Sequence, residues 1–147
     1  MPNLLINYSD DEEPNFDDYF KENDIGFRTK NSNYMKTLLT FISTIVTQIN
    51  LKINEEGIVI RAMDIGHISL INCFIPKNLF QTFNSDREHV IGLNLELLVQ
   101  ILNHLKPDDE LIFIFGKDDK INDKMEITYV NHKYDKFYEF KLVEIDE

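Results

Sequence analysis

The sequence contains very little cysteine and no long apolar run, and both absences narrow the class of protein. Its 147 residues include one cysteine, Cys73, which excludes an internal disulfide and favours a reducing compartment. No segment approaches the ~20 consecutive apolar residues that a membrane-spanning helix needs. The first residues, 1–6, lack the basic flank and long apolar stretch of a secretory signal. These absences indicate a soluble intracellular protein.

Patterns typical of enzymes and metal sites are also missing. There is no glycine-rich phosphate-binding loop. His67 lies near Asp64 and Ser69 in the sequence, but the histidines are scattered and the single cysteine does not complete a zinc-ligand spacing. We therefore expect no catalytic residue, no cofactor and no metal, and a protein that is not an enzyme.

Basic charge is scarce as well. The net charge is −11, from 26 acidic and 15 basic residues. This argues against a protein that coats nucleic acid with a basic surface. It does not exclude nucleic acid altogether, because a ring can be acidic outside and less acidic inside. With 43% hydrophobic and 28% charged residues, the composition predicts a folded globular protein rather than a disordered one.

Two regions differ along the chain. Residues 1–24 are acidic and show no helical or strand period, which predicts a disordered acidic tail. Residues 25–147 are regularly patterned and predict one folded domain with two similar halves, at about 25–86 and 87–147.

The first half begins with a predicted strand at 25–29, followed by a helix at 33–49 with Ser32 or Asn33 as its N-cap. The apolar stripe of that helix consists of Met35, Leu38, Leu39, Ile42, Ile45, Val46 and Ile49. Three strands are then predicted at 50–54, 58–63 and 67–75.

The second half repeats this order. A short strand at 90–93 leads to a helix at 94–105 that Asn94 caps, and strands follow at about 110–115, 124–130 and 136–144. The repetition predicts an α+β fold made of a duplicated β-α-β-β-β unit. Because each helix has one apolar stripe, both are expected on one face of an antiparallel sheet. The polar faces predicted for the helices are small and nearly neutral: Lys36, Thr40, Ser43 and Thr47 on the first, and Glu96, Gln100 and Asn103 on the second.

Three segments, GIVIRAMDIGHISL at residues 57–70 and the stretches at residues 92–102 and 138–146, together resemble the proliferating cell nuclear antigen (PCNA) family of DNA sliding clamps. Residues 57–70, GIVIRAMDIGHISL, are similar to a family segment with glycine, alternating apolar residues, Met-Asp and His before a strand. Phe80 also fits. Residues 92–102 look like the start of the family's second helix, and residues 138–146 like the end of its first domain. The family order is kept over residues 25–147.

The resemblance implies the DNA-clamp fold and a trimeric ring that encircles duplex DNA as a polymerase processivity factor in replication and repair. It implies DNA-facing helix residues, a pocket for partner peptides, and Tyr138 at the joint between subunits. The DNA-facing set is Lys36, Thr40, Ser43, Gln100 and Asn103. The pocket set is Met63, His67, Ile68 and Leu70. Without the resemblance, Met63, Ile68, Leu70 and Tyr138 are ordinary core or strand residues, and Lys36 is a solvated charge.

Two departures from the family pattern bear on these expectations. Only Lys36 keeps a basic residue on the channel face, although Arg28, Lys30, His104 and Lys106 lie nearby in the sequence, so DNA contacts are expected to be weak. The sequence ends at Glu147, where the family's connector to a second domain begins. We expect a fragment of a longer chain; a one-domain chain would need about six head-to-tail copies to close a ring.

Two alternatives stay open at the level of sequence. One is a clamp-derived scaffold, such as a PCNA-like late transcription factor of a large DNA virus, which would not encircle DNA. It would work in a cytoplasmic viral factory, whereas a replication clamp is expected in the nucleus. The other concerns the tail, where Glu13, Phe16, Tyr19 and Phe20 have the spacing of the family's partner peptide. Self-docking through them competes with a plain acidic tail.

Overall fold

The protein is known from a computed structural model, which describes residues 20–117 and 120–143. The elements of these residues are β1 (Ile25–Thr29), α1 (Ser32–Ser43), β2 (Gln48–Asn54), β3 (Gly57–Met63), β4 (Leu70–Pro76), the short 3-10 helix η2 (Lys77–Leu79), β5 (Thr82–Asn84), β6 (His89–Asn94), α2 (Leu95–Leu102), β7 (Glu110–Lys117), β8 (Lys120–Val130) and β9 (Asp135–Lys141). Apart from η2 and β5, which the sequence did not predict, the order is the expected one. The two halves read β1-α1-β2-β3-β4 and β6-α2-β7-β8-β9.

The strands form two antiparallel sheets rather than the single sheet expected. One sheet has the order β5-β1-β7-β8-β9 and the other β4-β3-β2-β6. Each half gives its first strand to the other half, because β1 pairs with β7 and β6 pairs with β2. The two sheets meet where the Val143 amide donates to the Gly92 carbonyl oxygen at 3.0 Å. The halves therefore share one core.

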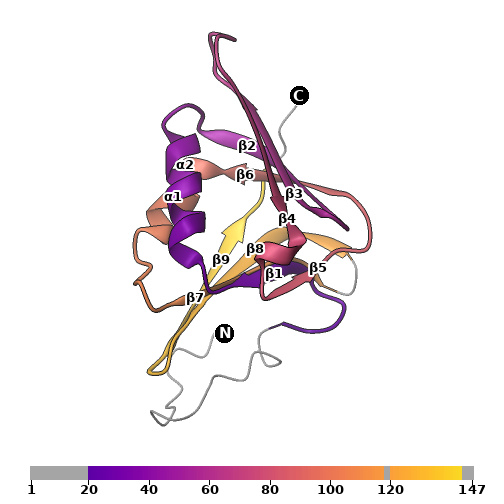
Figure 1. The fold of residues 1–147 in the computed structure, drawn as a ribbon, viewed down its shortest axis with the longest axis vertical. Coiled ribbons are helices and arrows are strands. Elements are labelled where there is room, and N and C mark those ends of the chain that lie inside the picture. The colour runs from indigo at the N-terminus through magenta and orange to yellow at the C-terminus, as the bar shows by residue number, and fades with distance from the viewer. Residues whose placement is uncertain (1–19, 118–119, 144–147) are drawn as a thin grey trace.

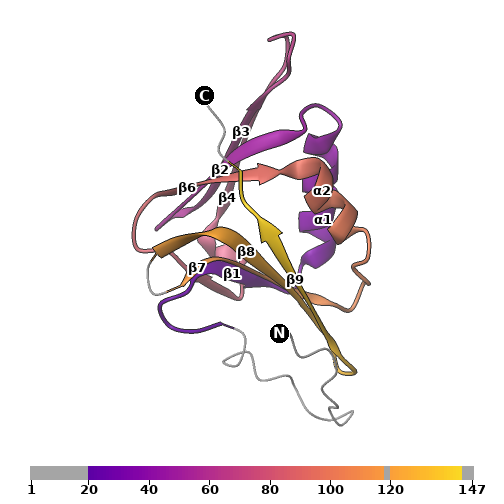
Figure 2. The ribbon, with the colours of Figure 1, turned by 180° about the vertical axis from the view of Figure 1, so that it is seen from behind.

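The core lies between the inner faces of the two sheets, and the helices close one side of it. Along β2 the alternate residues Ile49, Leu51 and Ile53 are buried, as a strand with one inward face requires. Met35 and Leu39 of α1 enter the same core, and Leu98 of α2 joins them. The helices α1 and α2 contact each other and lie side by side (Figures 1 and 2). This confirms the predicted α+β arrangement with both helices on one side.

The first helix is shorter than predicted. It ends at Ser43, and Ile49 faces the core from β2 instead. Apolar residues at 45, 46 and 49 fit either a helical stripe or the entry to a strand. The β-branched run from Thr44 to Thr47 disfavours further helix, because branching at Cβ restricts the side chain against the preceding turn.

The N-cap of α1 is Asn31, so the prediction of Ser32 or Asn33 was wrong. Ser32 is the first helical residue, and its hydroxyl donates to the Asp109 carbonyl oxygen at 2.7 Å. On α2 the predicted cap is confirmed, since Asn94 Oδ1 accepts from the Leu97 amide at 3.1 Å. Residues 1–19 of the predicted tail lie outside the described residues.

Replacing Gly92 by alanine is expected to destabilise the protein. An added Cβ would lie 1.9 Å from the Val143 carbonyl oxygen, a backbone atom at the joint between the sheets. The expected loss of unfolding free energy is about 3 kcal/mol, the upper part of the usual overpacking range. Gly66→Ala is the control, because its Cβ would meet the Asp64 side chain only at 3.4 Å. Urea unfolding measures both, and equal stabilities would contradict the role given to the joint.

Candidate functional site

The hairpin between β3 and β4 has a tip that its own backbone and one carboxylate hold in place. Asp64 Oδ1 accepts from the amides of Ile68 at 2.7 Å and Ser69 at 2.8 Å. The Asp64 amide donates to the Ser69 carbonyl oxygen, and the His67 amide to the Asp64 carbonyl oxygen. The Asp64 side chain thus closes the turn at residues 65–69. This turn delays β4 to Leu70, so the strand predicted from residue 67 begins three residues later.

These bonds set the acidity of Asp64. The amide of Ser69, and then that of Ile68, stabilises the carboxylate, so the pKa of Asp64 is lowered from its ordinary value of 3.8. The effect of burial is opposite in sign and smaller than that of the Ser69 bond.

The four predicted pocket residues are brought together on this hairpin and are exposed. Met63 and Leu70 are directly opposed across β3 and β4, and their exposed fractions are 48% and 54%. Ile68, at the tip, is 88% exposed. His67 has a φ of 58°, a left-handed conformation that histidine adopts more often than bulky residues do. The sequence did not single out Ile65, which is almost fully exposed beside them.

Large apolar side chains exposed together on a protein surface commonly mark an interaction site. On the same face of β4, two residues beyond Asn72, Phe74 is also exposed. β4 pairs with β3 on one side only, so its other edge is open to a partner beside the exposed Leu70.

The predicted DNA-facing residues lie on the paired helices but differ in exposure. Gln100 and Asn103 of α2 are exposed, whereas Lys36, Thr40 and Ser43 of α1 are only partly exposed. The Ser43 hydroxyl donates to the Thr40 carbonyl oxygen at 2.6 Å, so part of its polar capacity is used within the helix.

The most exposed face of α1 carries two aromatic residues that the sequence reasoning missed. Tyr34 is 57% exposed and Phe41 is 58% exposed, with the exposed Thr37 between them on the helix. They were missed because the exposed face was predicted from polar residue types alone, and an aromatic residue is not expected on that basis to face solvent. Leu97 of α2 is also exposed.

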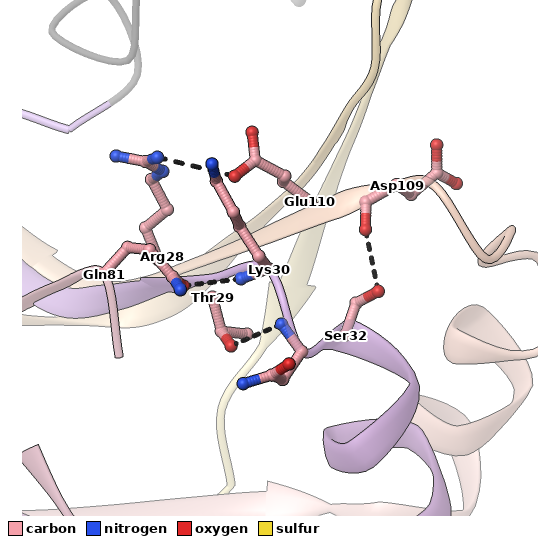
Figure 3. Close-up of polar contacts among 8 residues, drawn as sticks. Arg28, Thr29, Lys30, Ser32, Gln81, Asp109 and Glu110 are labelled. Carbon is pink, nitrogen blue, oxygen red and sulfur yellow. Dashed lines mark hydrogen bonds and ion pairs between the residues drawn. The ribbon is translucent and has the colours of Figure 1, made fainter. Parts of the chain in front are cut away.

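Arg28, which the sequence offered as an additional basic residue for DNA, already has an acidic partner. It lies on β1 with a guanidinium nitrogen 3.4 Å from Glu110 Oε1, and both side chains are mostly buried. Figure 3 shows this pair beside the start of α1, where the Lys30 amide donates to Gln81 Oε1 at 2.6 Å. These contacts position the beginning of α1 against the five-stranded sheet.

Tyr138 lies on β9, an edge strand of the five-stranded sheet. It is partly buried, and its ring centroid is 5.5 Å from that of Tyr129. The Tyr129 hydroxyl donates to the Ile101 carbonyl oxygen and so ties β8 to α2. Burial, then the negative charges of Tyr138 and Asp109, raise the pKa of Tyr129 well above its ordinary value.

The described residues contain neither a metal-binding cluster nor a membrane-spanning helix. No group of three His, Cys, Asp or Glu side chains in 20–117 and 120–143 is arranged to hold a metal ion. No helix in this part of the chain has the length and apolar character needed to cross a membrane.

Fold and surfaces together define a class: an α+β domain of two interlocked β-α-β-β-β units, with paired helices on one side and an exposed apolar hairpin. Residues 25–147 match the family model described as proliferating cell nuclear antigen, N-terminal domain. The chain belongs to the PCNA family, through that N-terminal domain. The expected family and clamp fold are confirmed.

Named relatives agree with this assignment. The DNA polymerase sliding clamp of Methanococcus vannielii is 34% identical over 109 residues, covering 74% of this chain and 42% of the relative. The proliferating cell nuclear antigen of Dictyostelium discoideum is 32% identical over 119 residues, covering 81% and 45%. This chain thus spans less than half the length of these relatives.

Solved structures support the fold. The crystal structure of the PCNA2–PCNA3 complex from Sulfolobus tokodaii superposes with a TM-score of 0.76 at 20% identity, over 84% of this chain and 48% of that one.

The role of the Asp64 carboxylate in closing the turn is testable. Because its pKa is lowered in the folded protein, its contribution to the turn is present above the unfolded value and is lost as pH falls through the lowered value. Asp64→Ala is expected to speed hydrogen exchange at the Ile68 and Ser69 amides at neutral pH, whereas Asp64→Asn, which keeps an acceptor oxygen, changes it less. NMR exchange measures both. Unchanged exchange in the alanine variant would exclude the closing role of Asp64.

Tyr129→Phe is expected to lower the unfolding free energy by about 1 kcal/mol, because the hydrogen bond from the phenol to the Ile101 carbonyl oxygen is lost. The raised pKa also gives a pH signature. The stabilisation from the neutral phenol is complete below the unfolded pKa near 10 and declines above it. Above about pH 10 the unfolding free energy should therefore fall less steeply with rising pH in the variant than in the parent. Parallel pH profiles would contradict this.

Proposed function

We propose that the protein acts as a subunit of a DNA sliding clamp, a processivity factor that encircles duplex DNA and performs no chemistry of its own. The observation that carries the proposal is the side-by-side pair α1 and α2 in a chain of the PCNA family. Because the chain spans less than half the length of its named relatives, ring closure is proposed for the assembled ring and not for a single copy of this domain. The proposed ring is a trimer, and the proposed compartment is the nucleus.

Besides the helix pair, the proposed function involves a second surface, which binds partner peptides. Met63, His67, Ile68 and Leu70 are proposed to receive the aromatic pair of a short partner peptide, in a mode where few anchor side chains supply most of the affinity. Their joint exposure on the β3–β4 hairpin supports this. DNA polymerase is the partner class that the names of the relatives suggest. Tyr138, on the edge strand β9, is proposed to pack at the joint between subunits.

Contact with DNA is proposed to be weak and mainly non-ionic. Lys36, Thr40, Ser43, Gln100 and Asn103 include one basic side chain, and Arg28 is paired with Glu110. A ring retains DNA by encircling it, so retention does not require strong phosphate contacts. The dependence of local DNA binding on salt should accordingly be shallow, because few counterions are released.

A loading experiment on the full-length gene product tests the proposed function. Retention on closed circular DNA, with release after the circle is cut once, is expected of a ring. Equal retention on circular and linear DNA would contradict encirclement. Failure to bind either would leave a scaffold that does not encircle DNA.

Leu70→Ala is expected to weaken binding of a peptide with two adjacent aromatic residues by at least about tenfold, the effect of a central anchor residue. Phe74→Ala is the matched control, because Phe74 lies on the same face of β4 and is equally exposed but is not among the proposed pocket residues. Fluorescence anisotropy with the full-length product measures both. Equal losses would mean that the surface is apolar but not a defined pocket.

A further inference from the structure

The outer face of the five-stranded sheet contains an apolar cluster that is buried although it points away from the core. Ile112 and Ile114 of β7 and Val130 of β8 form this cluster, which is separate from the main core. Alternation along β7 explains the separation, because Leu111 and Phe113 point to the opposite face and join the core. An outward-facing aliphatic cluster needs a cover to be excluded from water.

Residues 20–24, immediately before β1, lie against this sheet. The Phe20 side chain packs against the cluster. Asn84 Nδ2 donates to the carbonyl oxygens of Glu22 at 2.7 Å and Asp24 at 2.6 Å, which fastens the segment to β5. Figures 1 and 2 show the segment entering β1 at the end of the molecule away from the β3–β4 hairpin tip.

The segment also has its own turn. Asp24 is buried, and its Oδ2 accepts from the Lys21 amide at 2.8 Å. The Asp24 amide in turn donates to the Lys21 carbonyl oxygen at 3.1 Å. The pair of bonds closes residues 21–24 into a turn that directs Phe20 back onto the sheet. Residues 20–24 are therefore held by the packing of Phe20, by the two hydrogen bonds from the Asn84 side chain and by the turn that Asp24 closes.

We propose that residues 20–24 are a strap by which the chain docks onto the outer face of its own five-stranded sheet, with Phe20 as the anchor. The match to the family's N-terminal domain begins at residue 25, so the strap lies outside it. The folded unit then begins at Phe20 and not at Ile25. The docking surface is Ile112, Ile114 and Val130 and differs from the proposed partner pocket on the β3–β4 hairpin.

The strap has an electrostatic consequence. Residues 1–24 contain eight acidic residues and one basic residue, so they carry −7 of the net charge of −11. The cluster that holds Phe20 faces away from the core that α1 and α2 cover. The strap therefore joins the most acidic part of the sequence to the outer face of the five-stranded sheet, and the remaining residues, 25–147, carry only −4. This inference does not depend on the proposed function.

Tryptophan fluorescence tests the strap directly, because the sequence contains no tryptophan. Phe20→Trp in the full chain is expected to emit at shorter wavelength and to be quenched by acrylamide several times less than Phe41→Trp, whose site on α1 is 58% exposed. The two variants carry the same substitution, so the comparison isolates the environment. Equal emission and equal quenching would overturn the proposal.

A second measurement does not depend on how well tryptophan fits. Asn84→Ala, introduced into the Phe20→Trp chain, removes both bonds to the segment and is expected to raise acrylamide quenching toward that of Phe41→Trp. Phe20→Ser in the parent chain is expected to increase binding of a hydrophobic dye, whereas Phe41→Ser is expected to leave it unchanged or lower it. No response to either the Asn84 or the Phe20 change would mean that the strap does not cover the cluster.

Discussion

The exchange of first strands between the two halves is the constraint on which the rest of the structure depends. Because β1 pairs with β7 and β6 pairs with β2, neither half can form its sheet alone. Each helix follows directly after an exchanged strand, so the same pairing that builds the two sheets also brings α1 beside α2. The joint at Gly92 and Val143 closes the arrangement with a backbone bond that leaves no room for a side chain. The helix face is thus a product of the whole sheet topology.

Much of this fold was predictable from the sequence, for a physical reason. Period-2 burial along β2 and β3 and period-3.6 burial along the helices are local consequences of one-sided burial, and local patterns can be read without coordinates. The strand exchange was not predictable in this way, because the apolar pattern records which side of a strand is buried and not which strand lies next to it. The end of α1 was missed for a related reason, since Ile49 points into the same core from β2 as it would from a helix.

The candidate surfaces were also predictable only in part. The resemblance selected Met63, His67, Ile68 and Leu70, and the structure gives them a common place and high exposure. What the sequence did not reveal was the device that orders them, the Asp64 carboxylate accepting two amides of the tip. Such a bond depends on backbone direction over five residues, which no composition or period encodes. The exposed aromatics of α1 were missed because residue type alone predicts that an aromatic side chain is buried, and only the coordinates show that Tyr34 and Phe41 are not.

The charge distribution suits the proposed retention of DNA by encirclement. A protein that holds DNA by contacts alone needs many cations on the contacting face, and its affinity then falls steeply with salt. Here the helix pair offers few cations, Arg28 is paired with Glu110, and −7 of the net charge of −11 precedes Ile25. The proposed strap attaches residues 20–24, the end of this acidic segment, to the outer face of the five-stranded sheet. In the proposed ring, a helix face with few charges of either sign would neither repel DNA strongly nor bind it tightly enough to slow sliding.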